Sequence, residues 1–391
     1  MTTAFITPDM VRWARRRSFD SPDVAAQQLN FPKLKDWENG DARPTFRQAQ
    51  SLARKLRIPF GYLFLSTPPE EAMPLPELRT KSGTPPLKPS PDFLDVLYDA
   101  LRKQEWYHEH LASEEADPIP FVGRFNIQTP VADVARDIRR TLHLDELWQR
   151  RGLNMEAFSR ELVSRAEANG IVVMRNSVVG NNTRRHLDPD EFQGFAISDD
   201  LAPLVFINQN DYRSAQIFTF AHELAHIWMG LSGVSRLEYF AKPEQQPHDY
   251  ERVTDAIAAE TLAPADSFSL RWDMTLGTDT QLSKLSSFYH VSRFVILRRA
   301  YELNKVTLEV FREQYAELRR NILSKKKGGG GGGGGYGSIF SRNSNTVTTT
   351  VLYSLLEGRV PPKLASELLN VRIAKLRGLE QYLAQRETTH A

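Results

Sequence analysis

Apolar residues recur at helical spacing through much of this 391-residue chain, and this pattern predicts a mostly helical fold. Near the N-terminus, four short helices follow one another, each opened by a capping residue or a proline. They run from Thr7 through Trp13, from Ser21 through Leu29, from Pro32 to Trp37, and from Thr45 through Leu56. Residues 1–66 are therefore expected to form one helical bundle.

Prolines dominate the stretch that follows, because residues 67–91 contain eight of them. Prolines stiffen a chain toward extended conformations, so this stretch is predicted to be a linker. The helical pattern then returns in five segments, which are residues 92–101, 131–142, 155–169, 281–288 and 292–304.

Three short apolar runs between these helices are predicted to be strands: 171–174, 194–197 and 204–207. The turn residues Asp199 and Asp200 separate the last two runs, so those strands are expected to pair as a hairpin. A few strands among many helices predict an α+β fold, mostly helical, with a small sheet.

One predicted helix carries the pattern with the clearest chemistry. The apolar run 214–221 leads into His222-Glu223-Leu224-Ala225-His226, and Gly230 ends the segment. Residues four apart lie on one face of a helix, so both imidazoles can reach the same metal ion. A catalytic zinc usually has three protein ligands and lowers the pKa of its bound water to about 7, where a carboxylate such as Glu223 can accept the proton.

The third ligand is expected from a later helix. Glu251 is the best candidate, in a segment predicted to be helical until just before Pro264. Asp255 follows one turn later on the same face, where it can accept the second ring proton of a ligating histidine. His248 and Asp249 are rival ligands just before this helix. Ferrous iron or manganese would also suit two histidines and one carboxylate.

Four runs of sequence carry a resemblance: Gly-Phe-Ala-Ile, Ala-Pro-Leu-Val-Phe-Ile-Asn, Ala-Gln-Ile-Phe-Thr-Phe-Ala-His-Glu-Leu-Ala-His and Glu-Arg-Val-Thr-Asp-Ala-Ile-Ala-Ala-Glu. With them, residues 194–264 resemble the ImmA/IrrE family of zinc metallopeptidases. The resemblance implies a zincin-like domain with Zn²⁺ on His222, His226 and Glu251, and Glu223 as general base. Asp255 stands where that family usually has asparagine, a mild departure because thermolysin-like peptidases also place an aspartate there.

Substrate contacts are expected beside the metal helix. In zinc peptidases of this build, an edge strand holds the substrate backbone by β-augmentation, and the strand from Phe195 to Ile197 is the candidate, with plain core as the alternative. Tyr239 and His248 are candidates for stabilising the oxyanion.

Composition narrows the setting. The absence of cysteine excludes disulfides and thiolate metal sites. The N-terminus lacks the pattern of a signal peptide, and no apolar run approaches the roughly 18 residues of a spanning helix. The expected location is cytoplasmic, without a membrane partner.

Charge is uneven along the chain, although the net charge is only +2. Residues 1–66 hold eleven Lys or Arg against six Asp or Glu. The helix order there resembles a helix-turn-helix domain of the lambda-repressor (Xre) type. Its third helix offers only Asn30, Lys33 and Lys35 as possible DNA contacts, so a bundle kept for packing or for a protein partner is the alternative.

The C-terminal part begins with a run of eight glycines from Gly328 to Gly335, read as a flexible tether or a linker introduced by cloning. Residues 318–378 hold eleven Lys or Arg against two Glu, which suits nucleic acid or an acidic protein, with a solvated helix face as the alternative. This tail resembles the helix-turn-helix-like tails of long family members. The predicted domains are thus 1–66, the linker 67–91, a peptidase domain with its helical lead-in at 92–325, a Gly-rich tether at 326–337, and a basic helical region at 338–391.

The predicted function is zinc-dependent endopeptidase activity on a partner protein. The resemblance implies that this partner is a repressor or antitoxin in a stress, phage or toxin–antitoxin circuit. The alternative is a DNA-binding regulator or toxin component whose metal domain is a sensor or scaffold without turnover.

Overall fold

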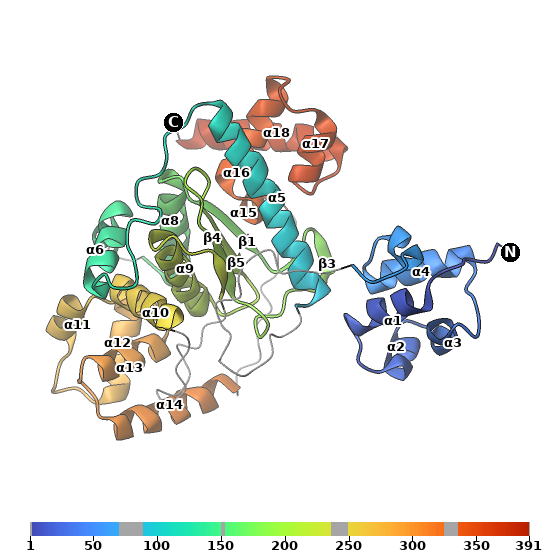
Figure 1. Cartoon of the computed structure of the whole chain (residues 1–391). Helices are drawn as coiled ribbons and strands as arrows, with labels where there is room; N and C mark the ends of the chain where they lie inside the picture. The colour runs from blue at the N-terminus through green and yellow to red at the C-terminus, as the bar shows by residue number, and fades with distance from the viewer. Residues whose placement is uncertain (1, 70–88, 150–152, 236–248, 324–334, 391) are drawn as a thin grey trace. The chain divides into compact units, whose positions relative to one another are not determined.

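The computed structural model describes residues 2–69, 89–149, 153–235, 249–323 and 335–390 (Figure 1). They form two compact units, one within Met1–Pro74 and Pro86–Asp95 and the other from Val96 to Ala391. Most of the predicted linker and most of the predicted Gly-rich tether fall outside the described residues.

The first unit contains the four predicted helices and a short 3₁₀ turn. These are α1 (Pro8–Arg16), α2 (Pro22–Gln28), α3 (Leu34–Asn39), α4 (Phe46–Leu56) and η1 (Phe60–Phe64). Thr45 and Gln48 form a capping box that opens α4. Within the apolar core, Arg15 Nε donates to Glu38 Oε1 at 2.6 Å, and both side chains are almost fully buried.

The second unit is built around a four-stranded mixed sheet with the order β1-β5-β4-β6. The strands are β1 (Val172–Asn176), β4 (Gly194–Ile197), β5 (Leu204–Asn208) and β6 (Gly233–Ser235). β1 runs parallel to β5, and β4 pairs antiparallel with both β5 and β6, so the predicted hairpin of β4 and β5 is confirmed. A separate hairpin joins β2 (Val178–Val179) to β3 (Asn182–His186).

Helices surround this sheet and make the unit mostly helical, as the α+β prediction required. The first group is α5 (Pro91–Ser113), α6 (Val131–Thr141), α7 (Leu144–Gln149), α8 (Met155–Ala168) and α9 (Arg213–Trp228). The second group is α10 (Asp249–Leu262), α11 (Ala265–Arg271), α12 (Thr278–Tyr289), α13 (Arg293–Glu302) and α14 (Leu308–Leu323). The C-terminal group is α15 (Tyr336–Asn343), α16 (Asn345–Leu356), α17 (Pro362–Leu368), η2 (Ile373–Lys375) and α18 (Leu376–His390).

Alternate residues of the strands face two different helical layers. Val173, Val205 and Ile207 join the core that α8 and α9 share with α10. Their neighbours Met174 and Phe206 face the opposite way and line a small pocket with residues of α5 and α15. The sheet is therefore buried on both faces, and the layer containing α9 positions the predicted metal ligands.

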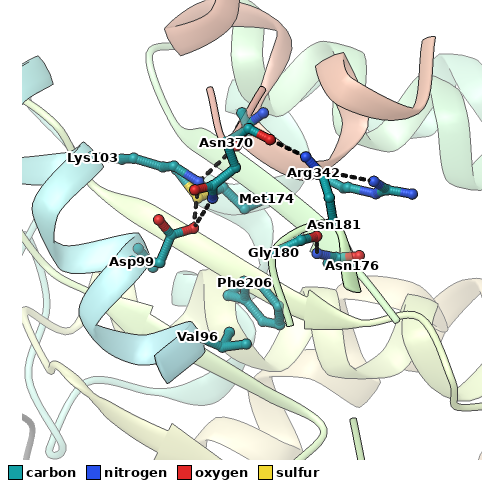
Figure 2. A pocket seen from close by; sticks show the side chains of 12 residues that line it. Val96, Asp99, Lys103, Met174, Asn176, Gly180, Asn181, Phe206, Arg342 and Asn370 are labelled. Atoms are coloured by element: carbon teal, nitrogen blue, oxygen red, sulfur yellow. Dashed lines mark hydrogen bonds and ion pairs between the residues drawn. The ribbon is translucent and has the colours of Figure 1, made fainter. Parts of the chain in front are cut away.

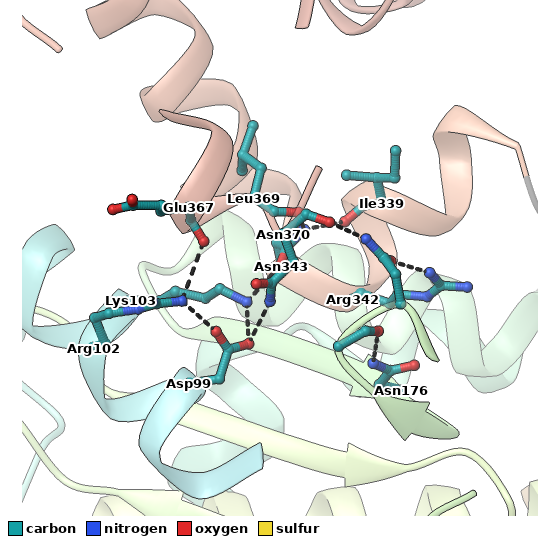
Figure 3. A network of polar contacts seen from close by, with 12 residues as sticks. Asp99, Arg102, Lys103, Asn176, Ile339, Arg342, Asn343, Glu367, Leu369 and Asn370 are labelled. Atoms are coloured by element: carbon teal, nitrogen blue, oxygen red, sulfur yellow. Dashed lines mark hydrogen bonds and ion pairs between the residues drawn. The ribbon is translucent and has the colours of Figure 1, made fainter. Parts of the chain in front are cut away.

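The C-terminal helices belong to the second of these layers, because α15 packs directly on β1. Figure 2 shows Lys103 and Asp99 of α5 beside Asn370, which follows α17. Lys103 Nζ donates to Asp99 and, at 2.6 Å, to Asn343 Oδ1. Asn370 donates to Asp99 at 2.8 Å, and Asn343 donates to the carbonyl of Leu369 at 3.1 Å (Figure 3). This network joins α5 to the ends of α15 and α17.

A second contact fixes the start of α16. The carboxylate of Glu167, at the end of α8, accepts hydrogen bonds from Ser344 Oγ at 2.6 Å and from the backbone N–H of Asn345 at 2.8 Å. An acidic group at a helix N-terminus satisfies N–H groups that have no partner within the helix. The C-terminal helices are thus attached at both α5 and α8. Among the described residues, no helix is long and apolar enough to cross a bilayer.

Candidate metal centre

Helix α9 carries His222, Glu223 and His226 through the core of the second unit, and every residue from Ala215 to Trp228 is buried. Its C-terminal end is capped by a preceding loop. The N–H of Gly123 donates to the carbonyl of Ile227 at 3.0 Å, and the N–H of Phe125 donates to that of Trp228 at 3.1 Å. These bonds satisfy carbonyls that a helix end leaves without partners, so the loop holds the register of α9.

Trp228 anchors the same end through its side chain. Its ring stacks on Phe121 with the centroids 4.0 Å apart, and its indole N–H donates to Asp137 at 3.0 Å. Burial alone would raise the pKa of Asp137, but hydrogen bonds from Trp228 and Arg124 lower it below the usual range. The ionised Asp137 therefore fixes the helix that carries the histidines.

Helix α10 packs against α9 and supplies the acidic groups. Glu251 and Asp255 are one turn apart, so both face α9, and both are buried. Among the described residues, His222, His226 and Glu251 form the one group of His, Cys, Asp and Glu that offers three ligand atoms within 4.8 Å of one another.

The spacing of these atoms fits a tetrahedral zinc ion. His222 Nε2 lies 3.0 Å from His226 Nε2, and each lies 3.4 Å from one oxygen of Glu251. With bonds of about 2.1 Å to a central zinc, neighbouring ligand atoms of a tetrahedron are about 3.4 Å apart. Two imidazole nitrogens facing each other inside the protein, with a carboxylate beside them, form a donor set suited to a shared cation.

Asp255 sets the orientation of one of these rings. Its Oδ1 lies 2.9 Å from His222 Nδ1, so it accepts the proton there and leaves Nε2 as the ligating atom. Burial opposes a charge on His222, but the hydrogen bonds to Asp255 and Glu251 outweigh it and raise the pKa of His222 well above the usual value in the metal-free protein. Burial also opposes a charge on Glu251, yet hydrogen bonds from both histidines lower its pKa.

Glu223 lies on α9 next to His222 and is fully buried. Its carboxylate approaches the backbone of β4, because a Cβ atom built on Gly194 would be 2.8 Å from Glu223 Oε1. One turn later along α9, burial lowers the pKa of His226 and favours the neutral imidazole that metals bind.

The predicted substrate contacts have a different outcome. The prediction that β4 is an edge strand is wrong for the described sheet, because β4 is paired on both sides and β6 lies beyond it. Phe195 is fully buried and stacks on Phe206 with the centroids 4.9 Å apart, and Ile197 is also buried, so both side chains belong to the core. Tyr239 and His248 lie outside the described residues.

The predicted DNA contacts lie in the first unit. Asn30 is exposed and has a left-handed backbone (φ 54°), Lys33 is exposed just before α3, and Lys35 forms an exposed ion pair with Asp23 at 2.7 Å. The pair neutralises part of the charge that Lys35 would offer to a phosphate group.

The local sequence pattern assigns no role to three residues that matter to the site. Asp137 and Trp228 meet across a long stretch of chain, and Gly194 matters through the space that it leaves. Only the pairing of a glycine with an expected strand facing a metal helix could have drawn notice to Gly194.

Comparison with known proteins finds a family match over the region that contains the candidate metal centre. Residues 166–301 match the family model described as IrrE N-terminal-like domain, a metallopeptidase family, and this match supports the ImmA/IrrE resemblance for that part of the chain. The matched range includes α9, α10 and the sheet but not residues 1–66. No curated protein matches the chain.

Proposed function

We propose that this protein is a zinc-dependent endopeptidase that cleaves a partner protein. One observation carries the proposal, which is the buried meeting of His222 Nε2, His226 Nε2 and the Glu251 carboxylate at 3.0–3.4 Å. The family match over residues 166–301 supports a metallopeptidase-like domain around these three side chains.

The chain's own residues divide the work of hydrolysis. A zinc ion held by the three ligands would polarise a peptide carbonyl and make a water molecule more acidic. Glu223 would accept one proton from the attacking water at its carboxylate and return it to the leaving amide nitrogen. The C–O bond forms first, and the C–N bond breaks once the nitrogen has received the proton, so one water molecule yields one carboxylic acid and one amine. Asp255 keeps the His222 Nδ1 proton in place throughout.

Glu223→Gln tests the proposal, because the amide keeps the size of the side chain but is a far weaker base. Zinc-loaded protein and the variant would each be incubated with a peptide library prepared from a whole-cell digest, and new termini would be identified by mass spectrometry. We expect new termini only with the unaltered protein, and none after treatment with a chelator. No cleavage despite one bound zinc per chain would favour a metal domain that acts as a sensor or scaffold. Equal cleavage by both proteins would contradict the role of Glu223 as general base.

The identity of the partner rests on the resemblance alone. We propose a repressor or an antitoxin, and the test is to incubate the zinc-loaded protein with purified regulators encoded beside its own gene. A defined cut that Glu223→Gln abolishes would support this partner. Intact regulators in the presence of a cleaved peptide library would contradict it without affecting the peptidase proposal.

A second candidate function, nucleic-acid binding, is favoured by the surface at the start of α18. Arg372, Lys375 and Arg377 are exposed there, and no ion pair engages them within the described part of the chain. They lie close together in the sequence, at the turn between α17 and α18. Such a surface suits phosphate groups, with each contact contributing about 0.9 to the slope of log affinity against log salt.

The test compares duplex DNA binding by the full chain with that of the triple variant Arg372→Ala, Lys375→Ala and Arg377→Ala over a range of salt. We expect the slope to fall by about 2.7 if all three residues contact phosphates. The pair Arg160→Ala and Lys284→Ala, on exposed positions of α8 and α12 outside the basic C-terminal part, is the control. An unchanged slope in the triple variant would reject this surface.

A further inference from the structure

Helix α9 and strand β4 approach each other unusually closely at one residue, Gly194. This residue lies in the interior of the sheet, paired with Ile207 of β5 on one side and with Ser235 of β6 on the other. It is buried, because α9 covers the face of β4 on which a side chain at this position would lie.

The closeness can be measured by building a Cβ atom on Gly194. That atom would lie 2.7 Å from Thr219 Cγ2, 2.8 Å from Glu223 Oε1 and 2.9 Å from the carbonyl oxygen of Phe206. Real Cβ atoms essentially never come within 3.0 Å of other heavy atoms. Gly194 does not have a positive φ, so a glycine is needed here for space and not for backbone conformation.

The two helix residues in this contact share one face of α9. Thr219 and Glu223 are one turn apart, and this face of α9 meets β4. On the same face of β4, Ala196 also has a small side chain and is fully buried. The strand therefore presents little bulk to the helix at both positions, whereas the large ring of Phe195 lies on the other face.

We propose that Gly194 is a positioning residue for Glu223. Its bare backbone gives the Glu223 carboxylate a place against β4, beside the metal ligands of the same helix. A methyl group at position 194 would occupy the position that Glu223 Oε1 approaches and push the carboxylate away. The catalytic consequence rests on the proposed peptidase function, but the packing relation between Gly194 and Glu223 does not.

A double-mutant cycle on local stability tests the packing relation without any activity assay. The full chain would be compared as Gly194→Ala, Glu223→Ala and the double variant. The measurement is hydrogen exchange of the backbone amides of β4 and β5, which reports opening of that part of the sheet. We expect the loss of protection caused by Gly194→Ala to be about tenfold smaller in the Glu223→Ala background, because the truncated side chain leaves room for the new methyl group.

The other two close atoms provide the opposing outcomes. Thr219→Ser removes the Cγ2 methyl group and keeps the hydroxyl that donates to the carbonyl of Ala215. If only this change relieves Gly194→Ala, or if neither change does, the glycine serves the helix or the Phe206 carbonyl, and the proposal is overturned. Gly277→Ala is the matched control, because nothing lies within 4 Å of a Cβ built there, so its exchange should be unaltered.

The functional arm compares zinc content and cleavage of the peptide library. Gly194→Ala should keep one zinc per chain, because none of the three atoms nearest to the added methyl group belongs to a metal ligand. It should lose about 10- to 100-fold in kcat with little change in KM, as expected for a misplaced catalytic group. If the unaltered protein cleaves nothing, the peptidase proposal fails while the exchange cycle still decides the packing relation. Full kcat in Gly194→Ala would overturn the positioning role.

Discussion

The hydrogen bond between Asp255 and His222 gives a prediction about metal binding that changes with pH. Asp255→Asn keeps an oxygen that can accept the proton of His222 Nδ1 at the observed 2.9 Å. The change removes only the negative charge behind the ring. The ring orientation should therefore stay the same while the basicity of its metal-binding nitrogen falls.

Two effects of this charge oppose each other. Loss of the partner of a metal-bound histidine typically costs about 10- to 100-fold in metal affinity, or about 1.4 to 2.7 kcal/mol. However, the same carboxylate helps to raise the pKa of His222 well above its usual value, opposing the effect of burial. A metal must displace that proton, so the affinity of the unaltered protein falls about tenfold per pH unit below this pKa.

The sign of the pH dependence follows from these effects. Asp255→Asn lowers the pKa of His222, so competition from protons begins at a lower pH in the variant. The variant should bind zinc about 10- to 100-fold more weakly at high pH. The difference should shrink steadily as the pH falls toward the range where only the unaltered His222 is protonated.

Competition with a coloured chelator at a series of pH values measures both dissociation constants. Calorimetry in buffers of different ionisation enthalpy would also count the protons that zinc binding releases. We expect the unaltered protein to release more protons than Asp255→Asn. Asp117→Asn, on an exposed loop, is the control. A ratio of dissociation constants that is the same at every pH would refute the reasoning, as would tighter binding by Asp255→Asn at high pH.

Three further predictions concern stability. Because the pKa of Asp137 is lowered on folding, its ionised carboxylate contributes fully to the free energy of unfolding above the unfolded pKa of about 4, and this contribution is lost as the pH falls through the folded pKa. Asp137→Asn should therefore make the melting temperature fall less steeply at acidic pH. The same acid dependence in the variant and the unaltered protein would argue against this role. Lys103→Ala should lower the free energy of unfolding by about 1–3 kcal/mol, less than the loss of a fully buried ion pair, because Asp99 is 24% exposed. The loss should appear as faster amide exchange in α15 and α17, and unchanged exchange there would count against the network. Glu38→Ala should destabilise the first unit by about 3–5 kcal/mol, because the Arg15 guanidinium stays buried without the carboxylate that pairs with it. Protection of the α1 and α3 amides against hydrogen exchange should fall, and retained protection would contradict this prediction.

The ligand-bearing helices could be predicted because their information is local. The spacing of His222 and His226 places both on one face of any helix, and the spacing of Glu251 and Asp255 does the same. The turn residues between β4 and β5 likewise identified their pairing, which the structure confirms. In each case the relevant residues lie within one helix or one hairpin.

The partners of these elements could not be predicted, because they depend on residues far apart in the sequence. β6 has only three residues, Gly233–Ser235, too few to form a recognisable pattern, and so β4 was mistaken for an edge. The indole of Trp228 donates a hydrogen bond to Asp137, which lies 91 residues earlier in the sequence. A local pattern shows that a side chain is apolar, but the packing decides which surface covers it.

Helix α15 packs on β1 although the two elements lie far apart in the sequence, so neighbours in space are not neighbours along the chain. The glycine run lies between this helix and the preceding part of the sequence. Lengthening a connecting segment raises the entropy cost of bringing its ends together only slowly, by about 0.6 kcal/mol for each doubling of length. Versions of the protein with longer or shorter glycine runs should therefore assemble the same layers. By the same logic, residues 336–390 made as a separate polypeptide should reassemble with the remainder when both are present at sufficient concentration.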